Sequence, residues 1–440
     1  MRRRFSLGRS LAFAILLAAP LAACKDEPPS ITGPDTFPGQ PTTFQMVVPA
    51  DSFVQGLGSF LGVTGTHDVP YLLVANQFDG ALNAHALAKL ADFPTSLSYT
   101  QGGTTRTDSV FTYGRGTLVA RLDTLYSTSS GPIELQVWAA GQDWDPASTT
   151  WDLAVDTTGV RTPWREAGGT RAVLLSRVSI NNAGSGIDSL LIPIDSLAVQ
   201  RLASKQYPGF IVTAAGAQGR MQLTGGITLR TSAHPKSASP DTAVALTIAA
   251  GAQTFVHTPD QPRSTTGAWE VGGLRSARTL FRVSFPRTVP VCQGKVCSSV
   301  PLRDVTLNEV SILLSPQAVP NGFRAVGALP TALRRVVEPE LGPRAPLGDV
   351  VNEVIGISPS RVPIYGGATY TPGDSLLAIP LTAIAAHLAA TDTTSTTLAL
   401  LSDQSVVPST LTPPNFGVVW FTARPRLRIV YTVSDRPTLP

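Results

Sequence analysis

Apolar side chains recur at every second position in several segments of this chain, which is the spacing of a half-buried β-strand. The stretch IELQVW at 133–138 alternates three apolar residues with polar ones, and residues 305–314 and 427–433 read similarly. Asp-Gly at 79–80 and Asn-Gly at 321–322 are turn dipeptides. With 38 glycines and 37 prolines in 440 residues, the pattern predicts an all-β protein of short strands and many turns.

Three segments have the spacing of short helices instead. Residues 81–93 place apolar side chains four apart, and residues 188–203 and 374–389 are two further candidates. The last two share six identities in sixteen positions, which indicates an internal repeat.

The repeat extends to neighbouring segments, because GITLRTSA at 226–233 is echoed by GVVWFTA at 417–423, and ADSFV at 50–54 by AQTFV at 252–256. We therefore place a boundary near Ala249. The sequence predicts two tandem β-sandwiches of jelly-roll type with short helical turns, over residues 43–249 and 250–440.

The first 23 residues are typical of a signal peptide. Arginines at positions 2, 3, 4 and 9 precede an apolar run at 11–21 that is too short to span a bilayer. The run ends in LAAC at 21–24, which resembles the lipobox of bacterial lipoproteins and implies lipidation of Cys24. An ordinary secretion signal cut nearby is the alternative. Residues 24–42 are rich in proline and glycine and predict an extended tether.

Cleavage before Cys24 changes the net charge of the chain. It removes four of the 34 basic residues and leaves 30 of each sign, with no basic cluster, so we expect no nucleic-acid partner. Lys25 after the lipidated cysteine resembles outer-membrane sorting. We expect a lipid-anchored protein of the cell envelope, in the outer membrane if the cell has two membranes.

Two cysteines remain, Cys292 and Cys297, on either side of a Gly-Lys step suited to a tight turn. An exported chain meets an oxidising compartment, so we predict a disulfide that fastens a hairpin. A metal site would need two more ligands, and a redox pair would need two intervening residues and not four.

The first half, over residues 45–249, resembles a DNRLRE domain, the disaggregatase-related family of secreted β-sandwich modules. The resemblance implies a β-sandwich associated with cell-surface polysaccharides. In WDPASTTW the family's signature glutamate is replaced by Pro146. The segments that carry the resemblance are LVARLDTLY (118–126), IELQVWAA (133–140), WDPASTTW (144–151), TPWREAGG (162–169), IPIDSLAVQRL (192–202) and YPGFIV (207–212).

Four of the six tryptophans lie within residues 138–164. Trp144 and Trp151 occupy signature positions of the resembled family, so we expect them to pack in the core. Trp138 and Trp164, with Arg165, are candidates for stacking on sugar rings and donating to hydroxyl groups, although they could equally cover the open end of a sandwich.

Asp143, Asp145 and Asp152 are candidate oxygen ligands for calcium, which accepts six to eight such donors. The alternative is a plain turn in which these carboxylates cap backbone amides. No other cofactor is indicated. The five histidines show no zinc or nucleophile motif, so we do not expect an enzyme.

The leading hypothesis is a non-catalytic envelope lipoprotein whose first domain binds a polysaccharide. A purely structural or assembly role and a polysaccharide lyase or hydrolase are the alternatives. The sequence leaves the ligand and the oligomeric state open.

Overall fold

Strands make up most of the computed structural model, which confirms the all-β prediction. The expected strands at 133–138, 305–314 and 427–433 are all present. No helix among the described residues has the length and apolar character needed to cross a membrane. Cys24 and nearly all of the tether lie outside the described residues, which are 41–61, 66–69, 71–181, 183, 189–274, 276–293, 295–357, 363–367, 369–391, 393, 395–403 and 417–433.

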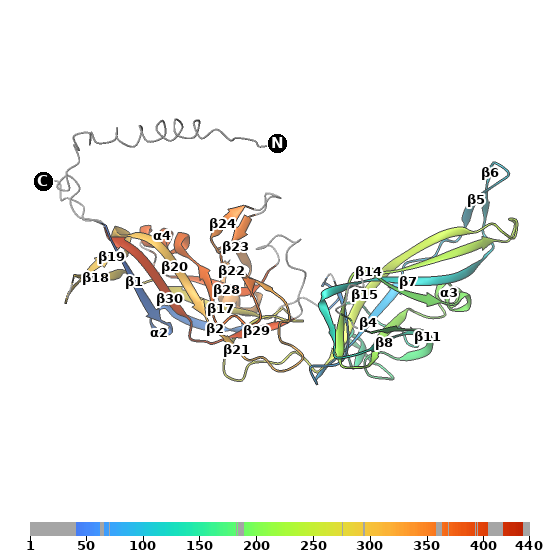
Figure 1. Ribbon diagram of the computed structural model, residues 1–440, viewed down its shortest axis with the longest axis horizontal. Helices are drawn as coiled ribbons and strands as arrows, with labels where there is room; N and C mark the ends of the chain where they lie inside the picture. Colours follow the sequence, from blue (N-terminus) through green and yellow to red (C-terminus); the bar gives the residue numbers. More distant parts are fainter. Residues whose placement is uncertain are drawn as a thin grey trace, which may run out of the picture.

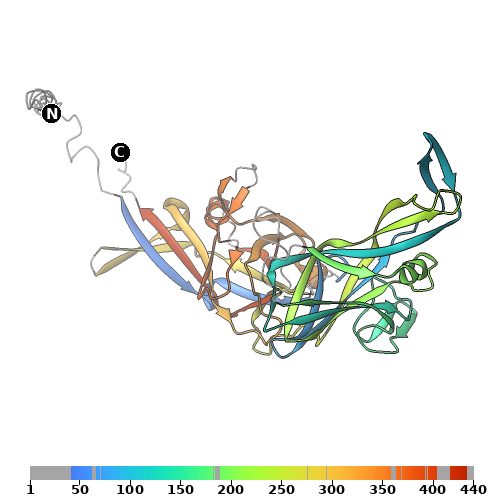
Figure 2. The ribbon, with the colours of Figure 1, turned by 45° about the vertical axis from the view of Figure 1, so that its right-hand side comes forward.

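The strands form two lobes (Figure 1, Figure 2). The middle lobe is built from residues 71–258. Its elements are β3 (Tyr71–Phe78), β4 (Leu82–Leu90), β5 (Leu97–Gln101), β6 (Thr104–Asp108), β7 (Phe111–Ser129), β8 (Ile133–Ala140), β9 (Leu153–Thr157), β10 (Val160–Pro163), β11 (Arg171–Ile180), β12 (Ser189–Ile194), α3 (Ser196–Ala203), β13 (Phe210–Gly216), β14 (Gly219–Pro235) and β15 (Val244–Thr258).

The terminal lobe combines the first described residues with the second half of the chain. Its elements are β1 (Thr42–Pro49), α2 (Ala50–Phe53), β2 (Val54–Phe60), β16 (Trp269–Gly272), β17 (Arg278–Ser284), β18 (Thr288–Gln293), β19 (Val296–Pro301), η2 (Leu302–Asp304), β20 (Thr306–Leu314), β21 (Pro316–Gln317), β22 (Leu329–Val336), η3 (Pro339–Arg344), β23 (Leu347–Val350), β24 (Val354–Ile357), β25 (Pro363–Tyr365), β26 (Thr369–Tyr370), β27 (Leu377–Pro380), α4 (Thr382–Ala390), β28 (Ser395–Ser402), β29 (Val418–Phe421) and β30 (Arg426–Val433).

Strand pairing divides the chain differently from a cut at Ala249. β15 runs through that residue, and its second part pairs with β4. β1 pairs with β30 along its whole length, and β2 pairs with β17. The terminal lobe therefore contains both ends of the described chain, and the middle lobe is inserted between β2 and β16.

The main sheet of the middle lobe has nine strands in the order β11-β8-β13-β4-β15-β14-β7-β12, with β3 joined to β4 and β14, and β5–β6 and β9–β10 form two separate two-stranded sheets. The first and last strands of that path, β11 and β12, contact each other, so the sheet curls round on itself. Alternate side chains of its strands, together with Ala198 and Val199 of α3, fill one enclosed hydrophobic core.

In the terminal lobe, two sheets face each other across a second core. The sheet β1-β30-β20-β27 contributes Val310, Ile312 and Ile429, and the sheet β2-β17-β28-β22-β23 contributes Phe281 and Leu400. This is the arrangement of a β-sandwich. The short helix α2, after Pro49, carries the chain from the first sheet to the second.

The helix expected at 81–93 is a wrong prediction, because residues 82–90 form β4. This strand has apolar neighbours on both faces, with Ala86 and Ala88 in the enclosed core and Leu87 on the opposite face. Burial on both sides removes the clean two-residue alternation and leaves a pattern that also suits a helix. The other two helical segments each contain a strand followed by a helix, β12-α3 and β27-α4.

Cys292 and Cys297 form the predicted disulfide, directly opposite each other in the hairpin β18–β19. Their Cα atoms lie 4.0 Å apart. The hairpin projects from the terminal lobe (Figure 1, Figure 2).

Candidate functional site

Residues 141–170, which we call the Trp segment, connect β8 to β11 and cover the outer face of the curled sheet. Val137 and Phe210 point into the enclosed core, whereas their neighbours Trp138 and Ile211 point outward. The outward side chains of β4, β8, β13 and β15 form a separate cluster with the Trp segment. All four clustered tryptophans take part in it.

Trp144 and Trp164 are buried in this cluster, at 2% and 6% exposure. The indole nitrogen of Trp164 donates to the carbonyl oxygen of Thr150 at 3.0 Å. Neither ring has a free face for a ligand. Trp144 therefore packs as expected, and Trp164 does not offer the stacking surface considered from the sequence.

Trp138 is half-buried, and its indole nitrogen and one face of its ring are occupied. Its indole nitrogen donates to Thr213 Oγ1 at 3.3 Å, and the guanidinium of Arg171 lies 5.5 Å from the ring centroid. Arg165 is exposed, and its backbone nitrogen donates to Gln142 and to Thr170.

The three candidate calcium ligands are not brought together. Asp143 Oδ1 accepts from Lys89 Nζ at 2.6 Å, and Asp145 Oδ2 accepts from Ser148 Oγ at 2.5 Å. Asp152 lines a separate hollow described below. Partial burial raises the pKa of Asp143, but the hydrogen bonds from Lys89 and the backbone outweigh it and lower the pKa overall. Across the described residues, no three carboxylate, histidine or cysteine side chains gather as a metal site.

A hollow of about 420 Å³ lies between the Trp segment, the end of β15 and the residues that follow it. We call it the Trp151 hollow, because Trp151 is its large aromatic side chain that remains half-exposed. Most of its other lining groups are polar or charged. The lining residues are Thr66, Thr149, Thr150, Trp151, Asp152, Leu153, Asp156, Arg161, Phe255, Val256, His257 and Asp260.

The ring of Trp151 is fixed from behind by His85 of β4, whose ring centroid lies 4.8 Å away. His85 Nδ1 is 2.7 Å from the carbonyl oxygen of Gly168, so this nitrogen carries the proton and donates. Burial lowers the pKa of His85 to about 4, against a smaller opposing effect of that hydrogen bond. The imidazole is therefore neutral at physiological pH.

Gly168 is required at this contact. Its φ is +79°, and a Cβ atom there would lie 2.7 Å from His85 Nδ1 and 2.8 Å from the Trp151 ring. Any side chain would push both rings away. The Gly-Gly segment thus sets the position of the aromatic wall.

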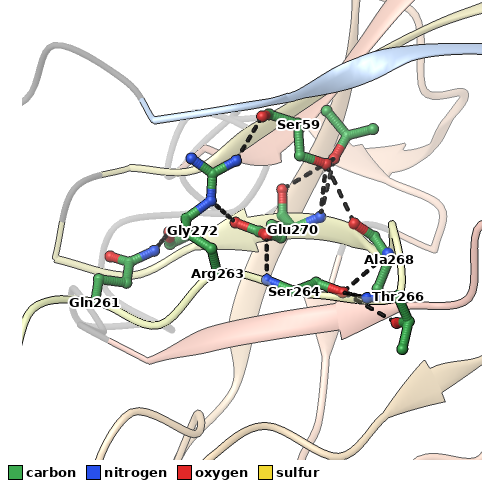
Figure 3. Close-up of polar contacts among 9 residues, drawn as sticks. Ser59, Gln261, Arg263, Ser264, Thr266, Ala268, Glu270 and Gly272 are labelled. Carbon is green, nitrogen blue, oxygen red and sulfur yellow. Dashed lines mark hydrogen bonds and ion pairs between the residues drawn. The ribbon is translucent and has the colours of Figure 1, made fainter.

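Another lining residue of the hollow, Asp260, lies in the loop that joins β15 to β16. Glu270 of β16, 2% exposed, holds this loop in place (Figure 3). Its carboxylate accepts from Arg263 Nε at 2.8 Å and from the Ser264 backbone nitrogen at 2.7 Å. Arg263 also donates to the carbonyl oxygen of Ser59 in β2, at 2.7 Å. The loop is therefore tied to two strands of the terminal lobe.

The lobes meet beside the hollow. Tyr71, Leu82 and Phe255 of the middle lobe share a hydrophobic cluster with Phe323 and Val418 of the terminal lobe. An ion pair of 2.9 Å between Arg324 and Asp79 adds to this contact. His257 lines the hollow, and its ring centroid is 6.3 Å from that of Phe323. The hollow is thus placed at a packed junction between the lobes.

Sequence reasoning identified Trp151 and Asp152 as neighbours but assigned them to packing and to calcium. It missed Thr66, His257 and Asp260, which come from segments far from the tryptophans. No local motif links those residues, so no signal in the sequence could have found them.

The Trp151 hollow has the chemistry that sugar recognition needs. An indole offers an apolar surface for the C–H face of a pyranose ring, and the carboxylates of Asp152 and Asp260 accept hydrogen bonds from hydroxyl groups. Arg161 can donate to sugar oxygens, although its Nε already donates to Asp156 at 2.9 Å. In small-ligand pockets, polar groups placed beside an aromatic wall fix the orientation of the ligand.

Comparisons with known proteins give no family. No family model matches the chain, and no curated protein matches it. Among solved structures, it is similar to a chain titled "BspA_C_mut", with 7% identity, a TM-score of 0.13, and coverage of 90% of this chain and 91% of that one. It is also similar to "BspA_C_WT", with 10% identity, a TM-score of 0.11, and coverage of 77% and 90%. At such TM-scores these likenesses carry no argument, and the resemblance to a DNRLRE domain stays a prediction.

Proposed function

We propose that this protein is a non-catalytic envelope lipoprotein that binds a polysaccharide in the Trp151 hollow. The observation that carries the proposal is a half-exposed indole, fixed from behind by His85 and faced by a rim of polar side chains. The site differs from the one considered from the sequence, because Trp164 is buried and Trp138 lies outside the hollow's lining.

The architecture that we propose is a pair of jelly-roll-like sandwiches, with the first inserted into the second. Each lobe has its own enclosed core, which supports two units. The same order of a strand, a helix and three strands occurs in both, as β12-α3-β13-β14-β15 and as β27-α4-β28-β29-β30. Lipidation of Cys24 would tether the pair to the membrane.

Binding is tested by titration calorimetry of the mature chain with a broad panel of soluble polysaccharides and their oligomers. Trp151→Ala is the test variant and Trp138→Ala its matched control, since both rings are half-buried in the same cluster and only Trp151 lines the hollow. We expect Trp151→Ala to weaken binding on the order of tenfold or more, the effect of losing one stacking ring, and Trp138→Ala to leave it nearly unchanged. Equal losses in the two variants, or no heat with any polysaccharide, would refute the proposal.

A purely structural role is the second candidate. Burial of Trp144 and Trp164 favours it, because these rings cover a sheet face that would otherwise meet water. This alternative predicts that no polysaccharide changes the fluorescence of Trp151. A lyase or hydrolase would instead release new chain ends in the calorimeter samples, which a reducing-end assay detects.

A further inference from the structure

The terminal lobe has a second hollow, of about 290 Å³, at the base of the disulfide hairpin. Its floor is apolar and includes Phe285, Leu302 and Leu388. Arg287 and Arg303 stand on its rim, one before β18 and one after β19. This combination of a cationic rim and an apolar floor suits a ligand with a negative group and an apolar part.

The two arginines are available for such a ligand. Both are exposed. Within the described part of the chain, the guanidinium of Arg287 has no hydrogen-bond or ion-pair partner, and Arg303 has only Asp304 at 3.9 Å. An exposed pair at that distance contributes little, so Asp304 would not hold Arg303 away from an incoming anion.

The hollow lies at the end of the molecule where the chain enters the fold. Pro290, two residues into β18, accepts a hydrogen bond from the hydroxyl of Tyr431. The Tyr431 ring stacks on that of Phe44 in β1, with centroids 5.7 Å apart. Thr42, the first residue of β1, pairs with Val433. Figure 1 shows the hairpin and the start of β1 at one end, opposite the β5–β6 hairpin.

Further features of this end suit a membrane surface. The hairpin projects beyond the lobe, and near its tip Val296 is 75% exposed beside Lys295. The predicted tether, residues 25–41, could span up to about 60 Å when extended, so it permits contact between this end and the bilayer without enforcing it. A tethered surface is present at high effective concentration, which makes even a weak second contact effective.

We propose that this hollow binds the headgroup of an anionic phospholipid in the membrane to which the protein is tethered. The negative phosphate would lie between Arg287 and Arg303, with the adjoining apolar part of the lipid over Leu302 and Leu388. The inference rests on the lipid-anchored part of the proposed function, and it is independent of polysaccharide binding.

The test uses the chain from residue 25 onward, secreted without acylation, which contains every described residue. Its binding is measured by flotation with vesicles of phosphatidylcholine alone and with added phosphatidylglycerol. We expect binding only to the anionic vesicles, weakened by salt. Arg287→Gln with Arg303→Gln should lower it on the order of tenfold, since each basic residue near an anionic surface contributes several-fold.

The matched control is Arg121→Gln with Arg230→Gln, which removes the same charge from exposed positions of the middle lobe. Equal loss in the control would mean that net charge alone drives binding, and it would overturn the proposal. Unchanged binding of the test variant would overturn it too. Inorganic phosphate is then added as a competitor while the total ionic strength is kept fixed. This measurement distinguishes capture of a free anion from docking on a bilayer. Full displacement of the protein from the vesicles by phosphate would refute the membrane assignment. Labelling of Cys24 with a radioactive fatty acid in cells tests the anchor separately.

Discussion

His85 should make the stability of the protein depend on pH in a way that one substitution removes. Its pKa falls from 6.5 in the unfolded chain to about 4 in the folded one, chiefly through burial. Between those values the unfolded chain binds a proton that the folded chain does not. The stabilisation is therefore complete above pH 6.5 and is lost as the pH falls towards 4.

The magnitude follows from the size of the shift. Each pKa unit corresponds to about 1.4 kcal/mol, so the full shift contributes up to about 3 kcal/mol. His85→Asn retains an amide that can donate to the Gly168 carbonyl oxygen but removes the titration. Between about pH 7 and about pH 4, we expect the free energy of unfolding of the variant to fall by about 3 kcal/mol less than that of the wild type.

Urea unfolding followed by tryptophan fluorescence at several pH values measures this difference. The control is His387→Asn, which replaces an exposed histidine on α4 in the other lobe. It should show the same pH dependence as the wild type. If His85→Asn does so as well, the imidazole is not held neutral by burial, and the account of the wall behind Trp151 is wrong.

Three further changes test the contacts around the fold. Gly168→Ala should lower the free energy of unfolding by about 3 kcal/mol, because a side chain there meets both strain from the positive φ and the rings of His85 and Trp151. Gly159→Ala should lower it by only about 1 kcal/mol, because Gly159 also has a positive φ but lies in open space. Chemical denaturation compares the two variants. Glu270→Gln should cost about 2 kcal/mol and expose the preceding loop, which joins β15 to β16, to proteolysis, since it removes the charge of a buried carboxylate that pairs with Arg263; unchanged cleavage would contradict this role. Replacing Cys292 and Cys297 by serine should cost at most about 2 kcal/mol, because the loop is short, and a loss of folding in a thermal melt would show that the bridge does more.

The elements that the sequence predicted well have a local cause. β8, β20 and β30 show alternating apolar residues because one face of each packs in a lobe's enclosed core while the other face carries several polar side chains, and the disulfide follows from two cysteines flanking a turn. β4 was predicted as a helix because a second layer, the Trp segment, covers its other face. That cover is a long-range contact, and the spacing within residues 81–93 cannot by itself distinguish a strand buried on both faces from a helix.

The candidate site was harder to predict for a related reason. Four tryptophans in one segment could be recognised, but which of them remains accessible depends on where that segment folds. Trp164 reaches into the cluster on the sheet and Trp151 stops at its edge, beside residues from β15 and the following loop. The pairing of β1 with β30 also joins segments almost four hundred residues apart, which a cut at Ala249 could not anticipate.

That pairing would have a mechanical consequence if the protein is anchored through Cys24 as we propose. A pull on the tether acts on Thr42 along the axis of β1. Drag on the middle lobe acts at the end of β2, from which the chain continues into that lobe. β1 is then loaded in shear against β30, and its eight residue pairs resist the force together instead of opening one after another. Rupture under force is governed by the rate of unfolding, so this geometry should keep β1 paired with β30 under flow even where the equilibrium stability of the fold is modest.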